Sequence, residues 1–108
     1  MISLEFRDER IIYLIPPKEI LLDVKRALNK SKLEIKEIKI RKNGWDIYAS
    51  NNDSYANVKI TYEKKRFYPF ETFGEIYINK LSTIAEGDED FVKKIKWNLE
   101  ISLLRCLP

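Results

Sequence analysis

The side chains that most often carry catalysis are scarce in this chain, which contains no histidine and a single cysteine, Cys106. Without histidine, neither a Ser-His-Asp nor a Cys-His site can form within one chain, and the commonest metal ligand is missing. One cysteine excludes an internal disulfide and a cysteine-rich zinc site. The spacing of the carboxylates singles out no acid–base pair. We therefore expect a protein that is not an enzyme and that uses no cofactor and no metal.

An acidic run, Glu86-Gly87-Asp88-Glu89-Asp90, is the segment that most resembles a cation site. It does not match a calcium loop, because Val92 and Lys94 stand where later oxygen ligands are needed. We interpret it as the start of a helix, with Asp88 as the N-cap and acidic residues in the first turn.

A basic and aromatic segment, residues 64–73, could bind single-stranded nucleic acid. Three consecutive basic residues open it, and four aromatic residues follow within seven positions: Lys64, Lys65, Arg66, Phe67, Tyr68, Phe70 and Phe73. Bases stack on aromatic rings while lysine and arginine contact phosphates. A net charge of only +3 is small for a nucleic-acid-binding protein. The structural alternative is a loop whose aromatic side chains tuck into the core and whose lysines are solvated.

Composition indicates one globular domain over residues 1–108. Hydrophobic residues make up 44% of the chain and charged residues 34%, which is typical of a folded protein. The first residues mix charges into their apolar run, unlike a signal peptide, and no apolar stretch is long enough to span a membrane. We expect a cytoplasmic protein without a membrane partner. Abundant isoleucine, lysine and glutamate without glutamine is typical of thermophiles, archaeal ones included. An AT-rich genome gives a similar bias.

The first thirty residues predict two short strands and a helix. Residues 1–15 divide at the charged stretch Arg7–Arg10, which can turn, and the apolar run Ile11–Ile15 suits a strand covered on both faces. Pro16-Pro17 ends the second strand, and a helix is expected over Lys18–Lys30. The apolar residues of this helix fall on one side at the 3.6-residue period: Ile20, Leu21, Val24, Ala27 and Leu28.

A hairpin is predicted around Asn43-Gly44, since this dipeptide supplies the two positive φ angles of a type I′ turn. The two-residue loop places Arg41 opposite Asp46, where the two can form an ion pair. The preceding apolar residues alternate out of phase with the hairpin, and a β-bulge near Lys36-Glu37 would reconcile them. The residues assigned to the core face of the hairpin are Ile38, Ile40, Ile47 and Ala49.

Further alternating segments predict strands over residues 56–62 and 75–79. In the second of these strands, Ile76 and Ile78 are expected on the inner side. The last helix is expected over Glu89–Leu107. The element order is then β-β-α-β-β-β-β-α. Four sequential strands without crossover helices predict an antiparallel sheet. The fold class is therefore α+β, with two helices and the long C-terminal helix packed on the sheet.

The last helix is apolar on two sides. One broad face contains Phe91, Val92, Ile95, Leu99, Leu103, Cys106 and Leu107. Nearly opposite lie Trp97, Ile101 and Leu104, at spacing i, i+4, i+7 between charged residues. A helix with two apolar faces must be covered on both. Either the first helix or the N-terminal hairpin covers the second stripe within the same chain, or a second copy or another protein does, with a two-fold dimer as the simplest case. A small apolar ligand between the sheet and this helix is a further alternative.

Overall fold

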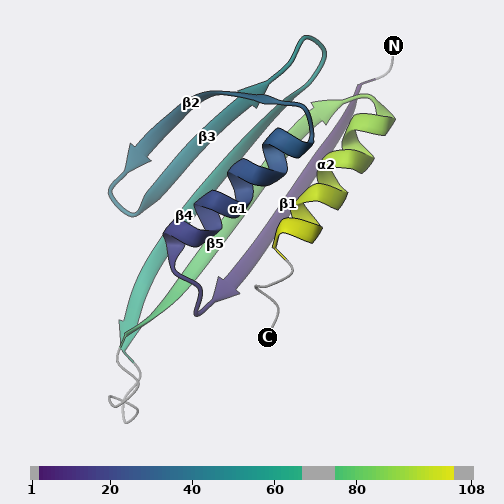
Figure 1. The fold of residues 1–108 in the computed structure, drawn as a ribbon. Helices are drawn as coiled ribbons and strands as arrows, with labels where there is room; N and C mark the ends of the chain where they lie inside the picture. Colours follow the sequence, from purple (N-terminus) through teal and green to yellow (C-terminus); the bar gives the residue numbers. More distant parts are fainter. Residues whose placement is uncertain (1–2, 67–74, 104–108) are drawn as a thin grey trace.

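The computed structural model describes residues 3–66 and 75–103, which form a five-stranded antiparallel sheet with two helices on one face (Figure 1). The strands lie in the order β1-β5-β4-β3-β2. The elements are β1 (Leu4–Tyr13), α1 (Pro17–Lys30), β2 (Glu34–Arg41), β3 (Gly44–Ser50), β4 (Tyr55–Arg66), β5 (Glu75–Gly87) and α2 (Glu89–Ser102). The predicted α+β class, the antiparallel sheet and the packing of the C-terminal helix on it are confirmed.

The prediction of two N-terminal strands is wrong, because β1 is a single strand paired with β5 along its whole length, from Leu4 opposite Gly87 to Tyr13 opposite Ile78. Its charged middle does not turn, because Arg7–Arg10 pair with Leu81–Ile84 of β5, and neighbouring charges on each face offset one another. Arg7 pairs with Glu5, and Arg10 Nε lies 2.5 Å from Asp8 Oδ2. Only one face of this strand is covered: Ile12 is buried, while Ile11 and Tyr13 are exposed.

The two helices lie side by side on the same face of the sheet (Figure 1). Helix α1 begins at Pro17, and its predicted core face is buried except for the half-buried Leu21. Helix α2 begins as predicted, since the Asp88 carboxylate accepts a hydrogen bond of 2.8 Å from the Phe91 amide. Between the helices, the Asn98 amide donates to the Ser31 hydroxyl at 3.0 Å. The core therefore fills the space between the helix pair and the sheet.

The hairpin between β2 and β3 is confirmed, but its register and turn differ from the prediction. Arg41 is opposite Gly44, so the two-residue loop is Lys42-Asn43, and Asn43 does not adopt the positive φ of a type I′ turn. Gly44 belongs to β3, where a Cβ would lie 1.8 Å from the carbonyl oxygen of Ile60 on β4. The close approach of β4 therefore fixes the glycine inside the strand and overrides the local turn preference.

Two details of this hairpin follow the prediction despite the changed register. Arg41 and Asp46 still form an ion pair, now diagonally, with Nη2 and Oδ2 2.6 Å apart. A register shift between Ile35 and Glu37 marks the expected bulge. The assignment of Ile40 to the core is wrong, since its side chain is 81% exposed on the outer strand of the sheet.

Strands β4 and β5 are longer than predicted. Lys64, Lys65 and Arg66 continue β4 instead of opening a loop, and Arg66 pairs with Glu75 at the start of β5. Figure 1 shows this end of the hairpin extending past the other strands. On β5 the helix-facing positions are the odd-numbered ones, such as Leu81 and Ala85, so Ile76 and Ile78 lie on the opposite face from the one predicted. Strand β4 follows the prediction, with Ala56, Val58 and Ile60 buried.

Candidate functional site

The outer face of α2 is the surface for which the sequence predicts an interface, and Trp97 and Ile101 are exposed on it. The Trp97 side chain is 63% exposed, and Ile101, one turn later on the same side of the helix, is 39% exposed. The opposite side of α2 is buried against the core through Phe91, Ile95 and Leu99. Helix α2 ends at Ser102, with Leu103 as its C-cap, so it is shorter than the predicted helix that extends to Leu107. Leu104, the third residue of the predicted stripe, lies outside the described residues, as do Cys106 and Leu107.

Charged side chains border this outer face. Lys93 Nζ lies 3.0 Å from Glu89 Oε1, and this contact raises the pKa of Lys93. Lys94 and Glu100 are exposed on neighbouring turns. An apolar centre that contains a tryptophan and has a charged rim is the usual composition of a protein interface. The arrangement suits insertion of the indole into a pocket on a partner.

The elements that could have covered Trp97 lie elsewhere. Helix α1 contacts α2 near Asn98, through its hydrogen bond to Ser31. The N-terminal segment forms β1 at the edge of the sheet, beneath the buried side of α2. The second apolar stripe and the packed face of α2 are therefore two separate surfaces.

The basic and aromatic segment does not present its described residues on one surface. Consecutive residues of a strand point to opposite faces, so Lys64 and Lys65 are separated by the sheet. Lys64 Nζ lies 5.5 Å from the centre of the Tyr77 ring, on the helix side, whereas Lys65 Nζ lies 3.7 Å from Glu63 Oε2 on the other side. Phe67, Tyr68, Phe70 and Phe73 lie outside the described residues.

A row of aromatic rings lies on the helix side of the sheet and was not predicted from the sequence. Trp45 and Tyr62 have ring centres 5.9 Å apart, and Tyr62 and Tyr77 are 6.3 Å apart. The three residues come from β3, β4 and β5, and Lys64 covers the last ring. Each aromatic residue occupies an inward position of its strand, but their proximity depends on strand registers that only the structure supplies.

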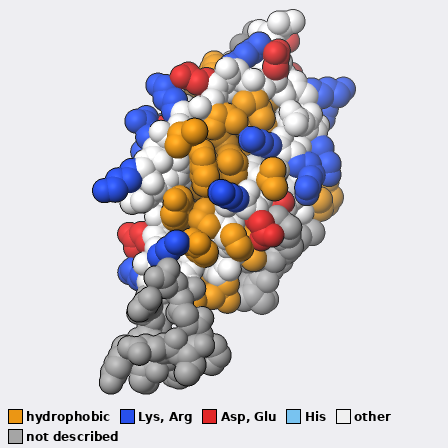
Figure 2. All heavy atoms as spheres, turned by 60° about the vertical axis from the view of Figure 1, so that its left-hand side comes forward, with side chains coloured by type: hydrophobic (Ala, Val, Ile, Leu, Met, Phe, Trp, Pro, Cys, Tyr) orange, Lys and Arg blue, Asp and Glu red, His pale blue; other side chains and the backbone are white. Residues whose placement is uncertain are grey.

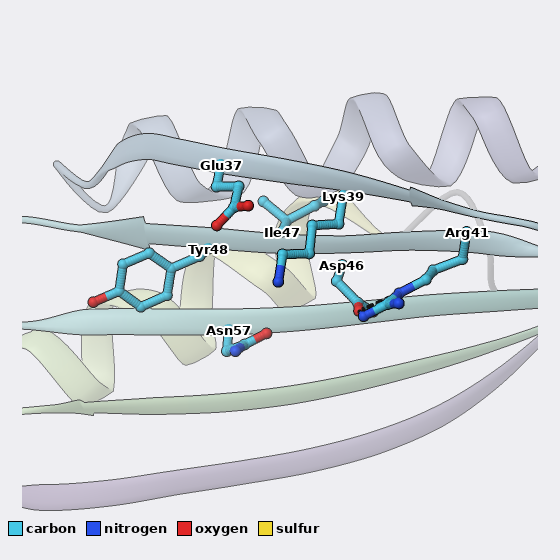
Figure 3. Close-up of a pocket in the computed structure, with 7 residues that line it drawn as sticks. All are labelled: Glu37, Lys39, Arg41, Asp46, Ile47, Tyr48 and Asn57. Carbon is cyan, nitrogen blue, oxygen red and sulfur yellow. Dashed lines mark hydrogen bonds and ion pairs between the residues drawn. The ribbon is translucent and has the colours of Figure 1, made fainter.

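A shallow, charged depression lies on the sheet face opposite the helices (Figure 3). Its volume is about 340 Å³. The residues that line it are Glu37, Lys39, Arg41, Asp46, Ile47, Tyr48 and Asn57. Arg41 bonds to Asp46, so charges of both signs alternate across the surface (Figure 3). Such a neutralised face provides no strong field for an anion or a cation.

Another polar contact on this face joins β4 and β5. The Tyr55 hydroxyl donates a hydrogen bond of 3.0 Å to Glu86 Oε2, and this bond raises the pKa of Tyr55. The tyrosine stacks on Tyr48 of β3, with ring centres 6.2 Å apart. These contacts fasten three strands to one another, which is a structural role.

Within residues 3–66 and 75–103, no three acidic, cysteine or histidine side chains come together as a metal site would require. Neither α1 nor α2 has the length and the apolar composition that crossing a bilayer demands.

No family model matches this chain, and no curated protein does. Among solved structures, the chain is similar to an uncharacterized protein from Rhizobium leguminosarum, with 9% identity, a TM-score of 0.34, and coverage of 97% of this chain and 99% of that chain. A similarity at this level carries no argument about function.

Proposed function

We propose that this protein is a non-enzymatic cytoplasmic interaction module that binds a second copy of itself, or another protein, through the outer face of α2. The single observation that supports this proposal is the exposure of Trp97 on a helix whose opposite side already packs on the sheet. Ile101 extends the same stripe by one turn.

The energetics favour a partner on this face. Burying a large apolar side chain is worth about 1.5–3 kcal/mol relative to leaving it in water. A tryptophan at the centre of an interface is among the residues that contribute most to binding, because it excludes water over a large area. A homodimer is the simplest assembly, since the same stripe on two copies can pack across a two-fold axis.

Trp97→Asp is expected to weaken self-association by at least about 30-fold, because truncating a central interface tryptophan costs about 2 kcal/mol or more. The monomer should remain folded, since the side chain is mostly in water. Sedimentation velocity over a range of concentrations measures the association, and circular dichroism checks the fold. Lys96→Asp, an exposed position on the same helix, is the matched control and should associate like the wild type.

Two results would contradict the self-association proposal. One is a wild-type protein that remains monomeric at high concentration, which leaves only binding to a different protein. The other is a Trp97→Asp variant that associates as strongly as the wild type and its Lys96→Asp control.

A second candidate function is binding of single-stranded nucleic acid around the end of β4 at Arg66. The predicted contact residues are Lys64, Lys65, Arg66, Phe67 and Tyr68, and Lys64 and Lys65 would contact the strand from opposite faces of the sheet. Its support is the placement of Lys64 over Tyr77, beside the Tyr62 and Trp45 rings. Aromatic rings that lie next to a lysine can stack bases while the ammonium group contacts a phosphate.

Reversing the charge of Lys64, Lys65 and Arg66 together, each to glutamate, should weaken binding to single-stranded RNA at least about tenfold at low salt, because phosphate contacts dominate such affinities. Fluorescence anisotropy with a labelled oligonucleotide measures the effect. Lys94→Glu on α2 is the control and should bind as the wild type does. Absence of wild-type binding at low salt would exclude this function.

A further inference from the structure

Strand β2 is an outer strand of the sheet, and the backbone groups along one of its edges pair with no other strand of the described residues. The alternation of hydrogen bonds identifies them. Tyr62 N donates to Asn43 O at 2.9 Å, so the odd-numbered residues of this part of β3 bond to β4 and the even-numbered ones bond to β2. Gly44 and Asp46 are opposite Arg41 and Lys39. The amide and carbonyl groups of Ile38 and Ile40, between these pairs, therefore point away from the sheet.

The side chains along this edge are apolar on the helix side. Ile40 is 81% exposed and Ile38 is half-buried. Figure 2 brings the β2 side of the molecule forward, and it shows hydrophobic side chains gathered in the middle of this face with lysine and arginine among them. An outer strand whose exposed edge has an apolar side can act as a template for pairing with another strand.

The residues after the bulge, Glu37-Ile38-Lys39-Ile40-Arg41, are complementary to themselves in the antiparallel direction. We consider two such segments that pair antiparallel with Lys39 of each copy at the two-fold axis. In this register Ile38 lies opposite Ile40 of the partner subunit on the helix side. On the other face, Glu37 lies opposite Arg41 of the partner subunit, and the converse pairs follow from the two-fold symmetry. The outward backbone groups of Ile38 and Ile40 meet as hydrogen-bonded pairs in this register.

We propose that two copies of this chain join β2 to β2 in this register, so that their two sheets become one continuous sheet. The pairing would add backbone hydrogen bonds and would cover the exposed Ile40 side chains, which the monomer leaves in water. This inference does not depend on the proposed role of Trp97, because the two surfaces lie on different elements. A protomer with two distinct two-fold interfaces would form a tetramer or an open chain instead of a simple dimer.

The lysine at the centre of the pairing is compatible with this arrangement. Lys39 would lie opposite Lys39 of the partner subunit, but Asp46 is its cross-strand neighbour within its own hairpin and offsets the repulsion. The register centred on Ile38 is less favourable, because it places the bulge between Ile35 and Glu37 within the paired segment. It also loses the pairing of Glu37 with Arg41.

The variant Ile40→Lys tests the interface, since it places a charge where two apolar side chains should meet. We expect at least about tenfold weaker self-association by sedimentation velocity. The monomer should remain folded, because the isoleucine is already mostly in water. Ile11→Lys, at an exposed isoleucine of the opposite outer strand, is the matched control and should associate like the wild type.

Cysteine cross-linking tests the register, in a Cys106→Ser background. Lys39→Cys should form a disulfide-linked dimer rapidly, because residues opposite each other in a non-hydrogen-bonded pair have Cα atoms about 4.5 Å apart, within disulfide range. Glu37→Cys should not cross-link to itself, but it should cross-link when mixed with Arg41→Cys. Non-reducing electrophoresis after mild oxidation measures all three.

The outcomes separate this interface from the one on α2. Association that survives Ile40→Lys but not Trp97→Asp overturns the strand pairing and leaves the α2 interface standing. Association that survives Trp97→Asp but not Ile40→Lys, with the predicted cross-links, supports the strand pairing alone. Self-cross-linking of Glu37→Cys that equals that of Lys39→Cys overturns the register, and a monomeric wild type overturns the pairing altogether.

Discussion

Gly44→Ala should destabilise the protein by about 3 kcal/mol or more, as expected for severe overpacking against the backbone. The added Cβ would lie 1.8 Å from the Ile60 carbonyl oxygen and 2.9 Å from its carbon. These are backbone atoms in the middle of a sheet, so β3 and β4 must separate locally to make room. Urea denaturation followed by circular dichroism measures the change in the free energy of unfolding.

Gly87→Ala is the matched control for this prediction. A Cβ at Gly87 would approach the Phe91 ring at 2.4 Å and the Ser54 hydroxyl at 2.5 Å, so side chains, and not the backbone of a neighbouring strand, would have to shift. The expected cost is about 1 kcal/mol. If Gly44→Ala costs no more than Gly87→Ala, then β4 does not pass as close to Gly44 as described.

The second large effect is expected on α2, where a buried residue should affect folding stability and an exposed residue should affect self-association. Ile95→Ala should cost about 2–5 kcal/mol of folding free energy, because Ile95 is fully buried and its truncation leaves a cavity in the core. Trp97→Ala, two residues later, should change the stability of the monomer by about 0.5 kcal/mol or less, since the indole is mostly exposed. Urea denaturation at low protein concentration measures both values without a contribution from association.

The same two variants should rank in the opposite order in sedimentation velocity. Trp97→Ala should weaken self-association, while Ile95→Ala should leave it unchanged under conditions where the variant is folded. A large stability cost for Trp97→Ala in the dilute monomer would mean that its own chain holds the indole, and the proposed interface on α2 would then lose its support.

Features that depend on nearby residues follow the pattern of the sequence. The amphipathic period of α1 and the cap at Asp88 depend on residues three or four positions apart, and both are confirmed. The alternation along β4 through Val58 and Ile60 depends on neighbours two positions apart, and it is confirmed as well. The bulge was inferred from a break in such an alternation and appears between Ile35 and Glu37.

Features that depend on residues far apart in the chain differ from the local pattern. The Asn43-Gly44 dipeptide predicted a turn, but the approach of Ile60 places Gly44 inside β3. Arg7–Arg10 predicted a break, but pairing with β5 keeps the segment extended. Lys64 and Lys65 looked like one basic cluster, but the extension of β4 places them on opposite faces of a strand.

The sequence by itself determined the class of the fold, the sides of the helices that face the core and the stripe that contains Trp97 and Ile101. Periodicity within one element is enough for these features, because burial selects side chains at the spacing of the helix or strand. Only the tertiary structure decided the strand registers, the exposure of Ile40 and the absence of a cover over Trp97 among the described residues. These features depend on contacts between segments far apart in the chain. A local sequence pattern does not determine which segments pair, or in which register.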